Sequence, residues 1–171
     1  MAKRNPKASS NKPKNQHALV SFPFRPSLRL KFSRSAPTRR LLPDSKRLQK
    51  VLQDIWSEHG QPPAEVEVNF VDANTICRLH QEYLGDPSPT DIVTFDLGET
   101  PNHFRLAALY ICLEVAGQHA RRYRASFAEE IRRLVIHGIL HLLGYDDRST
   151  AARRQMRRRE NQILKLVTQH E

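Results

Sequence analysis

Apolar and polar residues alternate in two segments of the chain, and two other segments are short, nearly uninterrupted runs of β-branched, aromatic or aliphatic residues. Alternation with a period of two indicates a strand with one buried face, and a short apolar run bounded by turn residues indicates a buried strand. Strands are therefore predicted at 28–32, 66–70, 92–95 and 106–111, the last of them fully buried.

Apolar residues at helical spacing predict four or five helices around these strands. Residues that favour helix starts occur at Asp44 or Ser45, Asp72 or Asn74, Ser126 and Ser149, and a further helix is expected over 113–124. The second of these helices should bury Ile76, Leu79 and Tyr83 on its inner face. Strands and helices in this order indicate one α+β domain.

The segment after Ser126 is apolar on nearly every side, so it should be the central buried helix of the domain. Ser126 and Glu129 have the three-residue spacing of a capping box, which begins a helix. Gly144 follows the apolar run and should end the helix in a left-handed turn.

The positive charge of the chain is confined to its first quarter. The net charge is +10, from 28 Lys and Arg against 18 Asp and Glu, but residues 1–43 contain eleven of the basic residues and no acidic one. Residues 1–26 are predicted to be a basic tail, with the first 17 disordered, ahead of a nearly neutral domain at 27–171. The favoured interpretation is a solvated arm; an RNA-contacting arm and a transit peptide are the alternatives.

Several classes of protein are excluded by the apolar runs and the cysteines. The longest apolar run, 106–113, is far shorter than the roughly 20 residues of a membrane-spanning helix, and no apolar segment follows the basic start as in a secretory signal. Cys77 and Cys112 are isolated and fit a reducing compartment. A cytoplasmic protein without a membrane segment is expected.

The strongest chemical signal is the segment HGILHLLGYDD at 137–147. His137 and His141 are four residues apart, so one helix face presents both imidazoles to one metal ion. A chain reversal at Gly144 can return Asp146 or Asp147 to the same ion as a third ligand. A glycine three residues after the second histidine and a ligand six residues after it is the spacing of metzincin-type zinc sites.

Two observations set alternatives beside this metal site. Two histidines on an apolar helix can instead be core residues that bond to main-chain carbonyls, although burial without a partner is costly. Metzincin-type sites also carry a glutamate base directly after the first histidine, and this chain has Gly138 there. A metallopeptidase is therefore the least favoured function.

Segments 137–147, 89–95 (PTDIVTF) and 110–116 (YICLEVA) together resemble signature segments of the YbeY endoribonuclease family, the ribosomal-RNA maturation factors. The resemblance extends from about residue 27 to 168. It implies a mixed sheet packed with helices, one zinc-like ion, and cleavage of single-stranded RNA in maturation of the 3′ end of 16S ribosomal RNA and in ribosome quality control. The implied partners are ribosomal RNA and the small ribosomal subunit, with no DNA; the oligomeric state is left open.

The resemblance assigns the metal ligands to His137, His141 and Asp147. The family has a third histidine at the last position, so the aspartate is a departure, and its harder oxygen makes Mn²⁺ or Ni²⁺ an alternative to Zn²⁺. Leu84 replaces a family arginine, and Ala107-Ala108 replace a Gly-Asp pair. These departures favour, as a second function, an RNA-binding maturation factor with little or no nuclease activity.

The general base must come from elsewhere, because no glutamate follows His137. Asp91 and Asp146 are the candidates; a turn residue before a strand and a residue that orients a ligand histidine are their structural alternatives. Arg121, Arg122 and Arg124 are candidate RNA contacts, or a solvated helix end favourable to the helix dipole. For the arginines of the last helix a solvated face is favoured over an RNA track.

Overall fold

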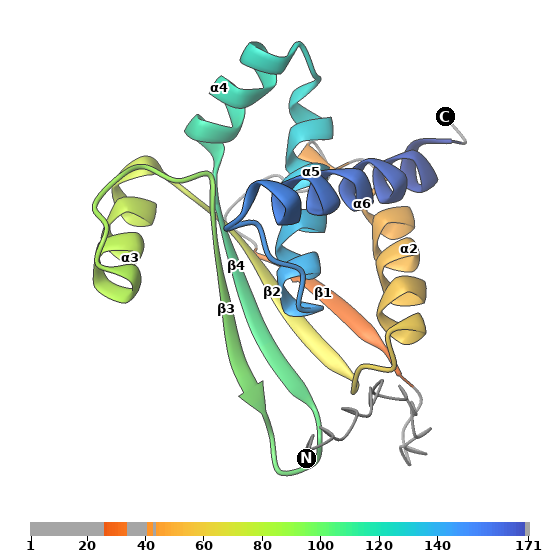
Figure 1. Ribbon diagram of the computed structural model, residues 1–171. Coiled ribbons are helices and arrows are strands. Elements are labelled where there is room, and N and C mark those ends of the chain that lie inside the picture. The colour runs from red at the N-terminus through yellow and green to blue at the C-terminus, as the bar shows by residue number, and fades with distance from the viewer. Residues whose placement is uncertain (1–25, 34–40, 43, 170–171) are drawn as a thin grey trace, which may run out of the picture.

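The computed structural model describes residues 26–33, 41–42 and 44–169, and it contains a four-stranded sheet and five α-helices within these ranges (Figure 1). The elements are, in chain order, β1 (Leu28–Phe32), α2 (Ser45–Glu58), β2 (Ala64–Val71), α3 (Ala73–Leu84), β3 (Ile92–Glu99), β4 (Arg105–Cys112), α4 (Leu113–Tyr123), α5 (Phe127–Leu142) and α6 (Thr150–Thr168). The predicted α+β class is confirmed.

The sheet is mixed, with strand order β1-β2-β4-β3. β1 pairs parallel with β2, and β2 pairs parallel with β4, whereas β3 and β4 form an antiparallel pair. The β3–β4 register places Ile92 opposite Ile111 and shifts between Asp96 and Glu99. Since Ile92 begins β3, the residue before it, Asp91, lies beside the end of β4, where its carbonyl accepts a hydrogen bond from Cys112 N–H at 2.9 Å.

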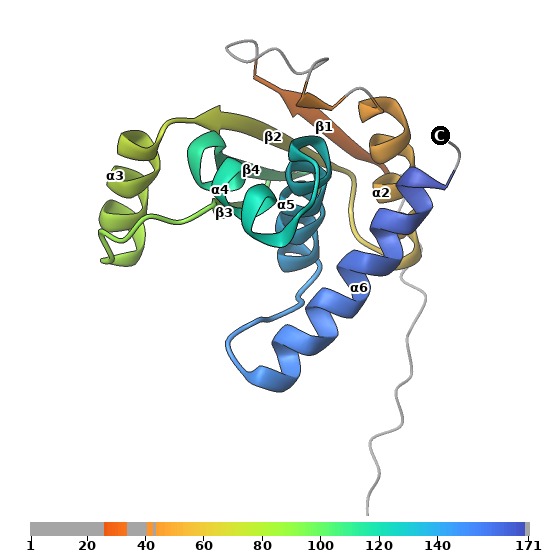
Figure 2. The same cartoon turned by 90° about the horizontal axis from the view of Figure 1, so that it is seen from above.

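Helix α5 packs against one face of the sheet, and α6 crosses α5 and α2 on the side away from the sheet (Figure 2). The core between these layers is formed by alternate residues of the strands and by the buried faces of α2, α5 and α6. The buried residues of α5 run from Glu130 to Leu142, and within this stretch only Arg133, His137 and His141 are partly exposed. Figure 1 places α3 beside β3, at the edge of the sheet opposite to β1.

Local signals in the sequence set most helix ends. The side chains of Asp72, Ser126 and Ser149 accept hydrogen bonds from Thr75, Glu129 and Ala152 main-chain N–H groups, as N-cap residues do. Asp44 precedes α2 but makes no such bond; its carboxylate instead pairs with Arg132 of α5 at 2.7 Å. The cap residue is therefore used to join two helices.

Two expected core positions are wrong. Tyr83 is 60% exposed, because α3 lies off the sheet edge and buries only its Ile76 side, while Tyr83 meets the edge of the Phe95 ring. The strand at 106–111 is not fully buried, since Leu106 is 36% exposed on the sheet face that helix α5 does not cover. The uninterrupted apolar run concealed this one-sided exposure.

Gly138 allows α5 to approach the sheet closely. A Cβ atom at this position would lie 2.6 Å and 2.9 Å from the two methyl carbons of Leu109 and 3.2 Å from Cδ1 of Ile92. The glycine therefore lets the helix that carries both histidines lie directly on β3 and β4.

Most of the basic tail proposed at 1–26 lies outside the described residues. Within the described part of the chain, none of the helices combines the length and the apolar character that a membrane crossing needs.

Candidate metal centre

Three side chains converge at the C-terminal end of α5. Nε2 of His137 lies 3.0 Å from Nε2 of His141, and Oδ2 of Asp147 lies 3.8 Å and 3.9 Å from these two nitrogens. Among the described residues, this is the group of three potential ligands whose atoms all lie within 4.8 Å of one another. All three side chains are partly exposed, so a metal ion can reach them from solvent.

The three ligand atoms fit a transition-metal ion. A triangle with sides of 3.0, 3.8 and 3.9 Å has a point about 2.1 Å from each corner, which matches typical Zn–N and Zn–O distances. An ion near this point would keep its remaining positions open, as in catalytic rather than structural sites.

The hydrogen bonds of the two imidazoles explain why their Nε2 atoms are acceptors. Nδ1 of His137 lies 2.8 Å from a carboxylate oxygen of Glu160, and Nδ1 of His141 lies 3.1 Å from the carbonyl oxygen of Tyr145. Each Nδ1 must donate to its oxygen partner, so each neutral ring carries its lone pair on Nε2. Two nitrogen lone pairs and a carboxylate facing one another can bind a metal ion, and a proton on His137 can satisfy the contact between the two nitrogens when no ion is bound.

The turn at Gly144 brings Asp147, the third candidate ligand, back to the helix. Gly144 has φ +88°, the left-handed conformation that favours glycine, and Tyr145 N–H then donates to the carbonyl of Leu140. The chain reverses within two residues and runs past the His141 ring to Asp147. The reversal predicted from the glycine is therefore present.

Glu160 of α6 orients His137, and it was missed in the sequence. Its side chain is 7% exposed; one oxygen accepts from His137 and the other pairs with Arg133 at 3.3 Å. A carboxylate that accepts from the second nitrogen of a ligand histidine fixes the ring and its tautomer. The residue lies 23 positions from His137 in a helix of ordinary amphipathic pattern, so no local motif indicates it.

The pKa shifts follow from these contacts. Burial lowers the pKa of His137, but the hydrogen bond and charge of Glu160 outweigh burial, so the pKa lies above its ordinary value. Burial, followed by the neighbouring His137, lowers the pKa of His141. A metal ion must therefore displace a proton from His137, and metal affinity should fall as the pH falls through the raised pKa of this residue.

Replacing Glu160 with glutamine should weaken metal binding about 10-fold, because a neutral amide orients His137 less firmly than a carboxylate. Titration with Zn²⁺ against a competing chelator measures this loss. Asn161→Asp is a control, since Asn161 also bonds Arg133 but does not touch His137. Equal Zn²⁺ affinity of Glu160→Gln and the wild type would show that Glu160 is only structural.

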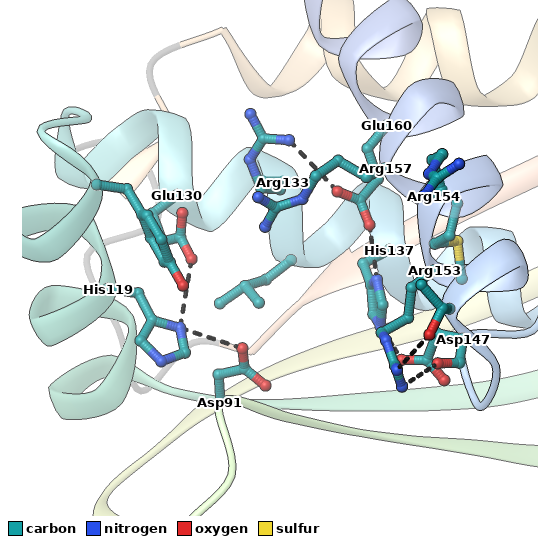
Figure 3. Close-up of a pocket in the computed structure, with 14 residues that line it drawn as sticks. Asp91, His119, Glu130, Arg133, His137, Asp147, Arg153, Arg154, Arg157 and Glu160 are labelled. Atoms are coloured by element: carbon teal, nitrogen blue, oxygen red, sulfur yellow. Dashed lines mark hydrogen bonds and ion pairs between the residues drawn. The ribbon is translucent and has the colours of Figure 1, made fainter.

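Two cavities meet at the ligand cluster. One of about 450 Å³ lies between α4, α5 and α6, and the other, of about 670 Å³, lies along β3 and α3. Asp91, His137 and Asp147 line both cavities. The cluster therefore stands at the junction of a longer groove, as Figure 3 shows for its first half.

The two candidate bases lie in different surroundings. Asp91 faces the junction, where its carboxylate lies 3.3 Å from Nδ1 of His119, which in turn lies 3.7 Å from the buried Glu130 (Figure 3). Asp146 pairs with Arg148 at 3.0 Å and lines a separate cavity beside His59. Asp91 lines both cavities that meet at the cluster, whereas Asp146 lines neither of them.

The predicted RNA-contacting arginines are also divided. Arg121 lines a different cavity, beside Phe127; Arg122 stacks near Tyr123; and Arg124, with φ +54°, ends α4. The arginines that do line the α4–α5–α6 cavity come from α5 and α6: Arg133, Arg153, Arg154 and Arg157. The role of Arg121, Arg122 and Arg124 in RNA binding stays a prediction.

Comparison with known proteins places the chain beside a group of bacterial proteins. A family model described as "Endoribonuclease YbeY" matches residues 37–168. Proteins named Endoribonuclease YbeY are 35% identical over 130 residues in Chlorobium phaeovibrioides (76% of this chain, 86% of the relative) and 33% identical over 138 residues in Salinibacter ruber (77% and 87%).

A solved structure is similar to this chain in fold. The solution structure of a Thermotoga maritima protein superposes with a TM-score of 0.56 at 25% identity, and the match covers 82% of this chain and 88% of that protein. The family match over residues 37–168 therefore includes most of the described fold and all three candidate ligands.

Proposed function

Since the chain belongs to the YbeY endoribonuclease family, we propose that it is a metal-dependent nuclease that cleaves single-stranded ribosomal RNA during ribosome maturation. As a member of this family it is an endoribonuclease, a hydrolase that acts on RNA. Metal dependence through His137, His141 and Asp147, the ribosomal substrate, and action at the small subunit in the cytoplasm are parts of the proposal.

The observation that carries the proposal is the convergence of three metal-ligating atoms at the junction of two open cavities. A divalent ion bound there would polarise a phosphoryl oxygen and lower the pKa of a bound water. His137 and His141 hold their lone pairs toward this position, while Glu160 and the Tyr145 carbonyl hold the rings. The arrangement suits hydrolysis of a phosphodiester bond in an extended strand.

Asp91 is the residue that we assign as general base. It faces the junction from the end of β3, fixed there by the hydrogen bond between its carbonyl and Cys112. His119 lies against its carboxylate and holds it toward the cavity. Asp91 would accept a proton from the attacking water, whereas Asp146 is engaged with Arg148 and faces elsewhere.

Zn²⁺ is the proposed ion, because two imidazoles and one carboxylate form a common catalytic zinc set. Mn²⁺ and Ni²⁺ remain alternatives, since Asp147 supplies a harder ligand than a third imidazole.

Neither alternative function is favoured. The relatives are named as endoribonucleases rather than as binding factors. A peptidase of the metzincin type needs a glutamate directly after the first histidine, and Gly138 at this place faces Leu109 and Ile92 without room for a side chain.

The proposal is tested by metal analysis and RNA cleavage on the same preparation. We expect about one divalent ion per chain, cleavage of a labelled single-stranded ribosomal RNA fragment, loss of cleavage in EDTA and recovery with one of Zn²⁺, Mn²⁺ or Ni²⁺. Failure to bind metal under any loading condition would overturn the site. Bound metal with RNA binding but no cleavage would favour a binding factor, and peptide cleavage would favour a peptidase.

Replacing Asp147 with histidine should preserve or tighten Zn²⁺ binding, because imidazole is a softer ligand at the same position. Asp147→Ala should weaken binding by about 100-fold or more, since removal of a ligand costs at least as much as removal of the group that orients one. Chelator competition measures both. Zn²⁺ affinity unchanged in both variants would show that Asp147 is a surface residue.

A further inference from the structure

Four arginines line the cavity between α4, α5 and α6, and two of them make no hydrogen bond or salt bridge with the described residues. Arg133 is engaged with Glu160 and Asn161, and Arg153 donates to the carbonyl oxygens of Asp147 and Arg148 at 3.1 Å and 3.2 Å. Arg154, by contrast, makes no hydrogen bond or ion pair with any described residue, and Arg157 makes no hydrogen bond with them but contacts the Tyr123 ring and acts electrostatically on Glu130.

Arg154 and Arg157 lie on the same face of α6. They are three residues apart, so their side chains are neighbours along the helix, and both line the cavity that ends at His137 and Asp147 (Figure 3). Guanidinium groups with no protein acceptor, beside a site for phosphodiester chemistry, match the geometry of phosphate oxygens.

Tyr123 stands on the opposite wall of the same cavity. Its side chain is 55% exposed at the end of α4, and the guanidinium of Arg157 lies 5.8 Å from its ring centroid. The ring centroids of His119 and Tyr123 are 6.1 Å apart, and the two ring planes are inclined at 68° to each other. An exposed aromatic ring beside a cationic group is the combination with which proteins bind single-stranded RNA, by stacking on a base and pairing with the phosphate.

The described residues that line the second cavity include no arginine or lysine, although the aromatic residues Tyr83 and Phe95 line it. Asp91 and Asp147 line both cavities, whereas Asp96 lines only this one. Phosphates of a bound strand are therefore favoured on the α6 side of the ligand cluster and disfavoured along β3. The first cavity, of about 450 Å³, falls in the range of roughly 300–1,000 Å³ typical for sites that enclose a small molecule or a single nucleotide.

We propose that Arg154, Arg157 and Tyr123 form the binding subsite for the nucleotide next to the cleaved phosphate of single-stranded RNA. Arg154 and Arg157 bind the phosphate of this nucleotide, and Tyr123 stacks on its base. This assignment rests on the proposed function, and it gives an RNA role to part of a helix face for which the sequence favoured solvation.

Binding of a labelled, nuclease-resistant 2′-O-methyl RNA heptamer, followed by fluorescence anisotropy over a range of salt concentrations, tests the two arginines. Arg154→Gln and Arg157→Gln should each weaken binding and reduce the slope of log affinity against log salt by about 0.7, the value for one phosphate contact in a single strand. Arg158→Gln removes the same charge from a neighbouring exposed position outside the cavity and should leave the slope unchanged.

The stacking contact has a different signature. Tyr123→Ala should weaken binding about 10-fold without changing the salt slope, and Tyr123→Trp should preserve it. In a series of heptamers with one abasic position each, a single position should make the wild type and Tyr123→Ala bind equally. Loss of the Tyr123 effect at one position only is the result expected for a defined stacked base.

Three outcomes would overturn the subsite: Arg158→Gln behaving like Arg157→Gln, Tyr123→Ala binding like the wild type, or the Tyr123 effect persisting at every abasic position. In all three, the wild type still binds and cleaves RNA, so the proposed nuclease function stands. A wild-type protein that neither binds the heptamer nor cleaves RNA would instead overturn the proposed function, and the subsite with it.

Discussion

The His141→Ala variant is expected to lose its metal ion and to cleave RNA about 1,000-fold more slowly than the wild type. A catalytic metal ion contributes several kcal/mol to transition-state stabilisation, and each 1.4 kcal/mol or so corresponds to a factor of ten in rate. Removing one of three ligands leaves His137 and Asp147, whose atoms are 3.8 Å apart, as the remaining pair.

His141 is the better ligand to remove, because its loss disturbs little else. Its Nδ1 bonds only the Tyr145 carbonyl, whereas removal of His137 would leave the buried Glu160 carboxylate without one partner. Cleavage is measured under single-turnover conditions, and metal content by elemental analysis of the same sample.

His59→Ala is the matched control. Nδ1 of His59 also bonds a main-chain carbonyl, that of Ile55 at 2.8 Å, and its ring lies 6.2 Å from that of Tyr145, yet it contributes no atom to the ligand cluster. It should retain metal and cleavage. Wild-type cleavage by His141→Ala with an intact thermal unfolding transition would show that the reaction does not use this site.

The three candidate ligands could be brought together from the sequence because they lie close to one another in it. His137, His141 and Asp147 lie within eleven consecutive residues, and helix periodicity together with one left-handed glycine is enough to place three side chains on one side. Spacing alone makes Asp146 an equal candidate for the third ligand, because a turn of this length does not determine which of two successive carboxylates faces inward.

The rest of the site depends on how distant elements dock. Glu160 reaches His137 because α6 crosses α5, and Asp91 reaches the junction because β3 is an edge strand antiparallel to β4. A pattern of apolar residues predicts that α6 has a buried face but not which buried polar side chain meets the histidine. Only the structure shows that Arg133 and Arg153 make hydrogen bonds within the protein, and that Arg154 and Arg157 make none with the described residues.

The Gly138→Glu variant is expected to be strongly destabilised. Even a Cβ atom here would lie within 3.0 Å of both Leu109 methyl groups, in a part of the core where Leu109 has no exposed surface. Overpacking a core by a few atoms costs about 1–3 kcal/mol, and a carboxylate in this position adds the cost of a buried charge without a partner. We therefore expect the free energy of unfolding to fall by more than about 3 kcal/mol, which is a large share of the roughly 5–15 kcal/mol of a typical protein.

The effect is measured by thermal and urea unfolding of the purified variant, or by its soluble yield if it does not fold. Gly117→Glu is the matched control, because Gly117 also lies within a helix but the nearest atoms to a Cβ there, from Phe127 and Arg121, are at 3.8 Å and 3.9 Å. It should be neutral or slightly stabilising, since glycine within a helix costs about 1 kcal/mol relative to alanine.

Gly138→Ala separates the two contributions, because it adds the Cβ atom without the charge. Gly138→Ala should lower the free energy of unfolding much less than Gly138→Glu does, because the higher helix propensity of alanine offsets part of the steric cost. If Gly138→Glu folds as stably as Gly117→Glu, α5 has room above Leu109 and the steric argument against a peptidase-type base fails. If it unfolds, the close approach of α5 to β3 and β4 that sets His137 and His141 beside Asp91 is incompatible with a glutamate base at this position.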